Sequence, residues 1–159
     1  LRHIRVPLQK PLEVSLRQDK IKWPVEEYKN ALGQISKNLQ SELFDAWGDI
    51  NDDSLVSDGA FNFSGLQIGG AIVALQPERS DPAYRDNDYH DISRTPCHGF
   101  VAFYLWLQEA FKADAIIHVG AHGTLEWLPG KSVALSENCW PEVLTGNLPV
   151  IYPFILNDF

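Results

Sequence analysis

The sequence has no methionine among its 159 residues, not even at position 1, and only two cysteines, Cys97 and Cys139. Because a complete natural chain begins with methionine, we expect a fragment or a processed piece. The two cysteines form neither a CxxC metal motif nor a disulfide framework, so reduced core thiols are favoured over the one possible disulfide. No stretch approaches the ~20 apolar residues of a membrane span. Residues 1–12 also lack the apolar core of a signal peptide. These absences predict a soluble cytoplasmic domain without a membrane span.

The chain also has no excess of basic residues, since its net charge is −8. Residues 1–30 contain seven Lys or Arg and four Asp or Glu, whereas residues 31–159 contain six and seventeen. The charge balance therefore disfavours nucleic acid as a partner, because phosphate binding depends on clustered basic side chains. The hydrophobic fraction of 45% in 159 residues predicts one globular domain with a sizeable core.

The first half of the chain predicts an extended start, a long helix and a linker. Residues 1–22 contain two prolines and form an unassigned N-terminal extension, so the domain itself is expected over residues 23–159. Apolar residues at spacings of three and four predict a helix that begins at Pro24, bends at Gly33 and stops at Gly48. The aspartate-rich residues 49–59 lack the residue order of a calcium loop and are expected to be a solvated linker.

The middle of the chain predicts a strand, a helix and a second strand. The apolar run 68–75 indicates a buried strand, and the long polar segment 76–97 indicates a functional or partner-facing loop. The helix that begins at His98 is apolar on most sides, which favours core packing over a flat-ring site. Together with a strand at 115–119, residues 69–119 predict a right-handed βαβ unit, and the apolar run near residue 150 predicts another strand of the same sheet. The expected class is α/β with a parallel or mixed sheet.

Three titratable side chains, His118, His122 and Glu126, lie four residues apart around two glycines at the end of the second strand. The spacing of the two histidines matches the HExxH zinc motif, but the glutamate of that motif is missing and the glycines disfavour a helix. Neutral imidazoles can bind a divalent metal here, and Glu126 can share that metal or accept a proton. The alternative is a structural turn in which His118 bonds to backbone and Glu126 caps a helix. Lys131 is either a surface lysine or a partner for a carboxylate or phosphate.

The stretch from Ile117 to Asp158, which starts IHVGAHGTLEWLPGK, closely resembles the CobN/magnesium chelatase H-subunit family. The segments from Tyr89 to Leu107 and from residue 71 to 79, AIVALQPER, resemble the same family. Within it, the motifs EWLPGK, LSE and YPF are similar to the cobalt type. The resemblance identifies the chain as part of a larger, multidomain chelatase subunit, with residues 23–159 as a partial family domain.

The resemblance implies a ligase that forms nitrogen–metal bonds: the large, macrocycle-binding subunit of ATP-dependent aerobic cobaltochelatase. That enzyme inserts Co2+ into hydrogenobyrinic acid a,c-diamide during cobalamin biosynthesis. Partner AAA+ subunits of the CobS and CobT type hydrolyse the ATP, in keeping with the lack of a Walker-type glycine loop here. The isolated fragment is expected to be inactive. The alternatives are a magnesium chelatase H-type subunit, which inserts Mg2+ into protoporphyrin, and a non-catalytic tetrapyrrole-binding or subunit-docking module.

The resemblance also suggests roles for individual residues. His118, His122 and Glu126 are expected to handle the metal, with His122 and Glu126 as the catalytic pair that accepts protons. The candidates for binding the macrocycle are Trp127, Lys131, His90, His98 and Tyr104.

Overall fold

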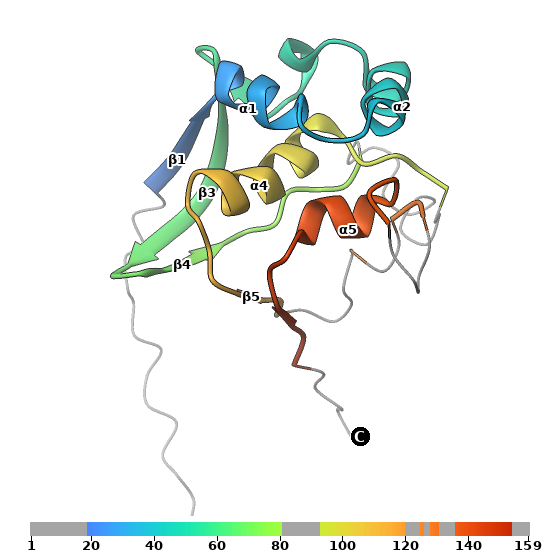
Figure 1. Ribbon diagram of the computed structural model, residues 1–159. Helices are drawn as coiled ribbons and strands as arrows, with labels where there is room; N and C mark the ends of the chain where they lie inside the picture. Colours follow the sequence, from blue (N-terminus) through green and yellow to red (C-terminus); the bar gives the residue numbers. More distant parts are fainter. Residues whose placement is uncertain (1–18, 81–92, 120–124, 126–127, 131–135, 154–159) are drawn as a thin grey trace, which may run out of the picture.

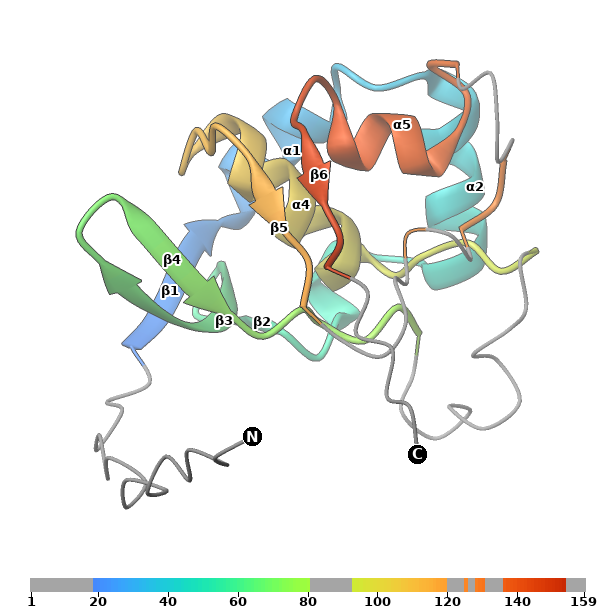
Figure 2. The same cartoon turned by 90° about the horizontal axis from the view of Figure 1, so that it is seen from below.

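The computed structural model describes residues 19–80, 93–119, 125, 128–130 and 136–153. Figure 1 shows its helices on one side of the strands, and Figure 2, seen from below, shows the strands in front. The helical elements are α1 (Val25–Leu32), α2 (Lys37–Trp47), the short 3-10 helix η1 (Ile50–Asp52), α4 (His98–Glu109) and α5 (Trp140–Thr145). The strands are β1 (Asp19–Pro24), β2 (Val56–Ser57), β3 (Ala60–Ile68), β4 (Ala71–Ala74), β5 (Ile116–Ile117) and β6 (Val150–Ile151).

The first sheet is antiparallel and is centred on β3, which pairs with β1, β2 and β4. Trp23 on β1 lies opposite Phe61 on β3. Strand β1 covers residues 19–24, so the expected domain boundary between residues 22 and 23 falls inside this strand. Along β3, Phe61 and Phe63 point into the core and stack on each other, with 6.2 Å between ring centroids. This alternation agrees with the period of two expected for a strand with one buried face.

The helix expected from Pro24 to Gly48 is two helices. Its two ends lie within one residue of the expected positions: α1 begins at Val25, directly after Pro24, and Gly48 follows the last residue of α2 at a φ of +69°. The single bent helix is wrong, because the chain leaves the helical conformation between Leu32 and Lys37. The side chain of Ser36 caps the new N-terminus by accepting a hydrogen bond from the Leu39 N–H.

The apolar run 68–75 is not one buried strand. Gly69 adopts a φ of +60° and turns the chain, so Ile68 pairs with Ala71 across a β-hairpin between β3 and β4. The outer side chains of this hairpin are exposed, including Ile68 at 60% and Val73 at 65%. A continuous apolar run cannot by itself distinguish a buried strand from the two arms of a hairpin.

Helix α4 is the centre of the core, as its apolar composition predicts. Every residue from His98 to Leu107 is buried, and Figures 1 and 2 show α4 between the antiparallel sheet and α5. Phe103 and Trp106 contact Phe63 of β3 at centroid distances of 5.4 and 5.8 Å. Both cysteines are free thiols, and Cys139 is buried beside this core.

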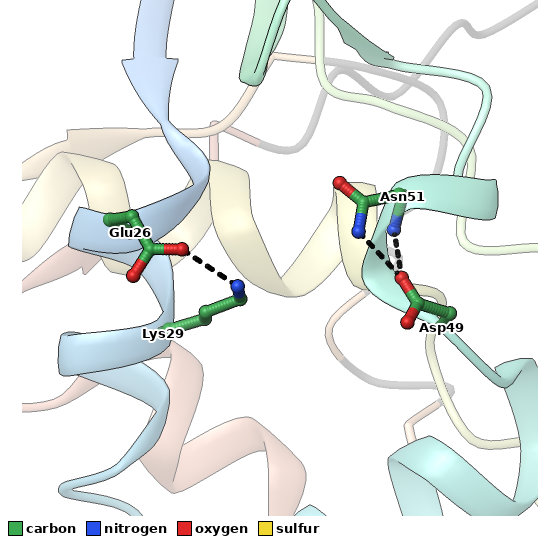
Figure 3. A network of polar contacts seen from close by, with 4 residues as sticks. All are labelled: Glu26, Lys29, Asp49 and Asn51. Atoms are coloured by element: carbon green, nitrogen blue, oxygen red, sulfur yellow. Dashed lines mark hydrogen bonds and ion pairs between the residues drawn. The ribbon is translucent and has the colours of Figure 1, made fainter.

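Residues 49–59 are ordered structure rather than a solvated linker. The Asp49 carboxylate begins η1 by accepting hydrogen bonds from the backbone N–H and side-chain amide of Asn51, at 2.8 and 2.7 Å, as Figure 3 shows. The backbone N–H bond holds the pKa of Asp49 below its usual range. The ion pair between Lys29 and Glu26 in the same figure is exposed, so its contribution to stability is small.

The second sheet is the parallel pair of β5 and β6, in which Ile116 lies opposite Val150 and Ile117 opposite Ile151. The expected βαβ unit over residues 69–119 is wrong, because β4 belongs to the antiparallel sheet and β5 does not pair with it. The strand expected near residue 150 is confirmed, and α5 precedes it, so the parallel connection lies between β5 and β6. The α/β class with parallel and antiparallel pairing is confirmed.

Candidate functional site

Of the three side chains expected to handle a metal, His118 is the one that the structure describes. His122, Glu126, Trp127, Lys131 and His90 lie outside the described residues, so their roles stay predictions. Among the described residues, no group of three or more His, Cys, Asp or Glu side chains is arranged to hold a metal ion. The metal-binding hypothesis therefore depends on how His118 is placed.

His118 follows β5 directly, and Tyr152 follows β6 directly. The backbone N–H of His118 donates to the carbonyl of Ile151 at 2.8 Å. The two rings meet edge to face, with 5.6 Å between centroids and 87° between planes. Both side chains are half-buried. The carboxyl ends of adjacent parallel strands are where open α/β sheets form ligand sites, so this ring pair marks the candidate site.

The described residues Leu125 and Leu128–Gly130, on either side of positions 126 and 127, are anchored to the core. Leu125 packs against the core cluster, and Leu128 is 3% exposed within it. The carbonyl of Pro129 accepts a hydrogen bond from the Trp140 N–H at 3.3 Å, which joins this segment to α5. These contacts fix Leu125 and Leu128 against the core and Pro129 to the first residue of α5.

His98 lies in the interior rather than on an open surface, since it is 1% exposed. Its Nε2 is 3.2 Å from the Gly48 carbonyl, which can only accept, so Nε2 carries the proton of the neutral ring. Nδ1 therefore accepts from the Tyr28 hydroxyl at 2.9 Å. Burial lowers the pKa of His98 and raises that of Tyr28, which keeps both groups neutral. In this environment His98 joins α1 and the end of α2 to the start of α4.

Tyr104 is likewise part of the core. It is 2% exposed, and its ring contacts Phe100 and Phe103. Its hydroxyl donates to Gln76 Oε1 at 2.9 Å, and burial raises its pKa. A direct contact of Tyr104 or His98 with a macrocycle stays a prediction, and their described contacts are with protein groups.

A cavity of about 440 Å³ is lined in part by residues from both ends of the polar segment 76–97. Its walls include Trp47, Asp53, Glu78 and Cys97. Asp53 is already engaged, because its carboxylate accepts from the backbone N–H of Gly99 at 2.7 Å. Burial raises the pKa of the Cys97 thiol to about 12, so it is a poor metal ligand or nucleophile at neutral pH.

Two residues that shape these regions, Asp53 and Tyr152, were not among the site residues predicted from the sequence. Asp53 caps the N-terminus of α4 from a distant part of the chain, and no local spacing signals such a contact. Tyr152 belongs to the YPF motif but was not predicted as a site residue. The sequence did contain a signal for Tyr152: in AIIH and in VIYP, a residue with an aromatic ring directly follows a short strand of β-branched residues.

The described chain is thus an α/β unit with a candidate ligand site at the carboxyl ends of two parallel strands, and none of its described helices is long and apolar enough to cross a membrane. The family model for CobN/Magnesium Chelatase matches residues 5–159, so the chain belongs to this family.

Three similar proteins illustrate the relationship. The aerobic cobaltochelatase subunit CobN of Pseudomonas aeruginosa is 44% identical over 137 residues, covering 84% of this chain and 11% of that protein. The H-type magnesium-chelatase subunit of Rhodobacter capsulatus is 42% identical over 94 residues, covering 59% of this chain and 8% of that protein. The solved catalytic subunit of cobaltochelatase from Mycobacterium tuberculosis matches with a TM-score of 0.73 and 33% identity, over 87% of this chain and 13% of that one. The chain therefore spans about a tenth of the length of these relatives.

Proposed function

We propose that this chain forms part of the large, macrocycle-binding subunit of an ATP-dependent aerobic cobaltochelatase. The observation that carries the proposal is the placement of His118 beside Tyr152 at the carboxyl ends of the β5–β6 pair, in a chain 44% identical to CobN subunits. The substrates are Co2+ and hydrogenobyrinic acid a,c-diamide. AAA+ partners of the CobS and CobT type supply the ATP hydrolysis.

Insertion of Co2+ replaces two protons on the ring nitrogens, so the site must deliver a metal and accept two protons. A neutral imidazole coordinates Co2+ through its unprotonated nitrogen, and this role falls to His118 and His122. The carboxylate of Glu126 and the imidazole of His122 are the proton acceptors. Trp127 provides an apolar wall for the macrocycle, with His90 and Lys131 as further candidate contacts, whereas His98 and Tyr104 support this region from the core.

The test uses a complete CobN-type subunit that carries this segment, assembled with its AAA+ partners. Glu126→Gln and His122→Ala are expected to reduce the chelation rate about 100-fold or more, as for the loss of a general base, while the macrocycle still binds. Glu42→Gln is the matched control, because Glu42 is an exposed carboxylate on α2, outside the strand-end segment and outside the family motifs. Undiminished chelation in both variants refutes the proposal.

A magnesium chelatase H-type function is the second candidate, supported by the 42% identity to the Rhodobacter capsulatus protein. The cobalt type is favoured because the similarity to the Pseudomonas aeruginosa CobN covers 84% of this chain, against 59% for the Rhodobacter capsulatus protein. A visible-absorbance titration with corrin and porphyrin ligands, with and without Co2+, separates the two. Binding of a macrocycle without any effect of the metal or of the site variants indicates a non-catalytic binding or docking module.

A further inference from the structure

We propose that Tyr152 is a positioning residue for His118, and that its ring holds the imidazole in the orientation that receives Co2+. This inference rests on the proposed function for the role of His118 in handling the metal. It adds a residue that the sequence-based site prediction left out.

The pairing of β5 with β6 sets the register of the backbone around both residues. The N–H of Ile116 donates to the Pro149 carbonyl at 2.9 Å, and the N–H of His118 donates to the Ile151 carbonyl at 2.8 Å. These two bonds set the register directly before the two rings. The backbone of His118 is therefore aligned with that of Tyr152 before any ligand binds.

The ring contact then restricts the His118 side chain. Side chains alternate along a strand, so His118 lies on the same face as Ile116, which packs against the core, while Ile117 on the opposite face is 65% exposed. On that face the Tyr152 ring meets the imidazole at 87°. Edge-to-face contacts favour one relative orientation of two rings. An imidazole that is already oriented loses less rotational freedom when it coordinates a metal, and this preorganisation increases affinity.

The contact between Tyr152 and His118 joins their two aromatic rings. Tyr152→Phe keeps the ring and therefore keeps this contact, whereas Tyr152→Leu keeps apolar volume without the aromatic face. Phe111→Leu is the matched control, since Phe111 is also half-buried and contacts a different ring, that of Trp106.

The first measurement needs no metal. In the 159-residue chain with 13C-labelled histidine, ring relaxation is recorded for the His118 signal, which is assigned by its loss in His118→Gln. We expect the His118 ring to become more mobile in Tyr152→Leu and to be unchanged in Tyr152→Phe and Phe111→Leu. Equal ring mobility in all four proteins overturns the proposal.

The second measurement titrates the same proteins with Co2+ and follows its visible absorption. Tyr152→Leu is expected to bind Co2+ about tenfold more weakly, as when other partners that orient a metal-binding histidine are removed, with an altered spectrum. Loss of affinity in Tyr152→Phe as well overturns the assignment to the ring, and unchanged affinity in Tyr152→Leu overturns the positioning role. If wild type binds no Co2+, or if His118→Gln binds as wild type does, it is the metal role of His118 in the proposed function that fails. The relaxation measurement then still decides whether Tyr152 holds the ring.

Discussion

The hydrogen bond from Tyr28 to His98 allows a quantitative prediction for the substitution Tyr28→Phe. The hydroxyl is 2.9 Å from Nδ1, and the two residues are 0% and 1% exposed, so water cannot replace the lost donor. Leaving a buried acceptor without a partner costs about 1–3 kcal/mol. For a chain of this length, a loss of about 2 kcal/mol lowers the melting temperature by about 4–8 °C.

The control for this prediction is Tyr104→Phe, the same chemical change at a second core tyrosine. Tyr104 is 2% exposed, but its acceptor, Gln76 Oε1, belongs to a half-buried side chain that is partly accessible to water. We expect a loss of less than about 1 kcal/mol there. Urea unfolding of both variants measures the difference, provided that the slope with denaturant stays that of wild type. Equal losses in the two variants, or an unchanged Tyr28→Phe protein, would refute the reasoning that burial of His98 sets the cost.

Two further predictions concern the same end of α4. Because the folded-state pKa of His98 lies below its usual value near 6.5, the neutral ring stabilises the fold fully above that pH, and this stability is lost as the pH falls through the folded pKa. Below pH 6.5, the free energy of unfolding of wild type should therefore decrease more steeply with falling pH than that of His98→Asn, by up to about 1.4 kcal/mol per pH unit. Equal slopes of the two proteins, measured by urea unfolding at a series of pH values, would contradict this. Asp53 accepts from the N–H groups of Gly99 and Leu55, so Asp53→Ala should cost about 1–2 kcal/mol, while Asp52→Ala at an exposed neighbour should stay within about 0.5 kcal/mol. Thermal unfolding monitored by circular dichroism compares the two, and similar losses would show that Asp53 does not cap α4.

The parts of the fold that the sequence predicts are those set by local chemistry. The start of α1 after Pro24 and the end of α2 at Gly48 depend on backbone preferences of the residues at those positions. The burial of α4 follows from its own composition, since ten successive residues from His98 to Leu107 are buried. Each of these features is decided within a few residues of chain.

The errors concern properties that adjacent residues do not determine. The run 68–75 has enough apolar residues for a buried strand, but Gly69 folds it into a hairpin. The partner of β5 is β6 rather than β4, and periodicity shows that a segment is a strand without showing what it pairs with. For the same reason the sequence placed His118 correctly at the end of a strand but did not bring Tyr152 to it.

The geometry of the candidate site depends on the core more than on its own small sheet. β5 and β6 are two residues long, and a pair of such short strands is not stable by itself. The packing of Ile116 against the core cluster holds β5 in place. Leu128, three residues before Lys131, lies in the same cluster. The opposite face of the pair is open, with Ile151 53% exposed. Substitutions in the core beneath Ile116 should therefore move His118 and Tyr152 together, whereas substitutions on the exposed face leave their contact intact. That difference separates damage to the scaffold from damage to the site when variants are compared.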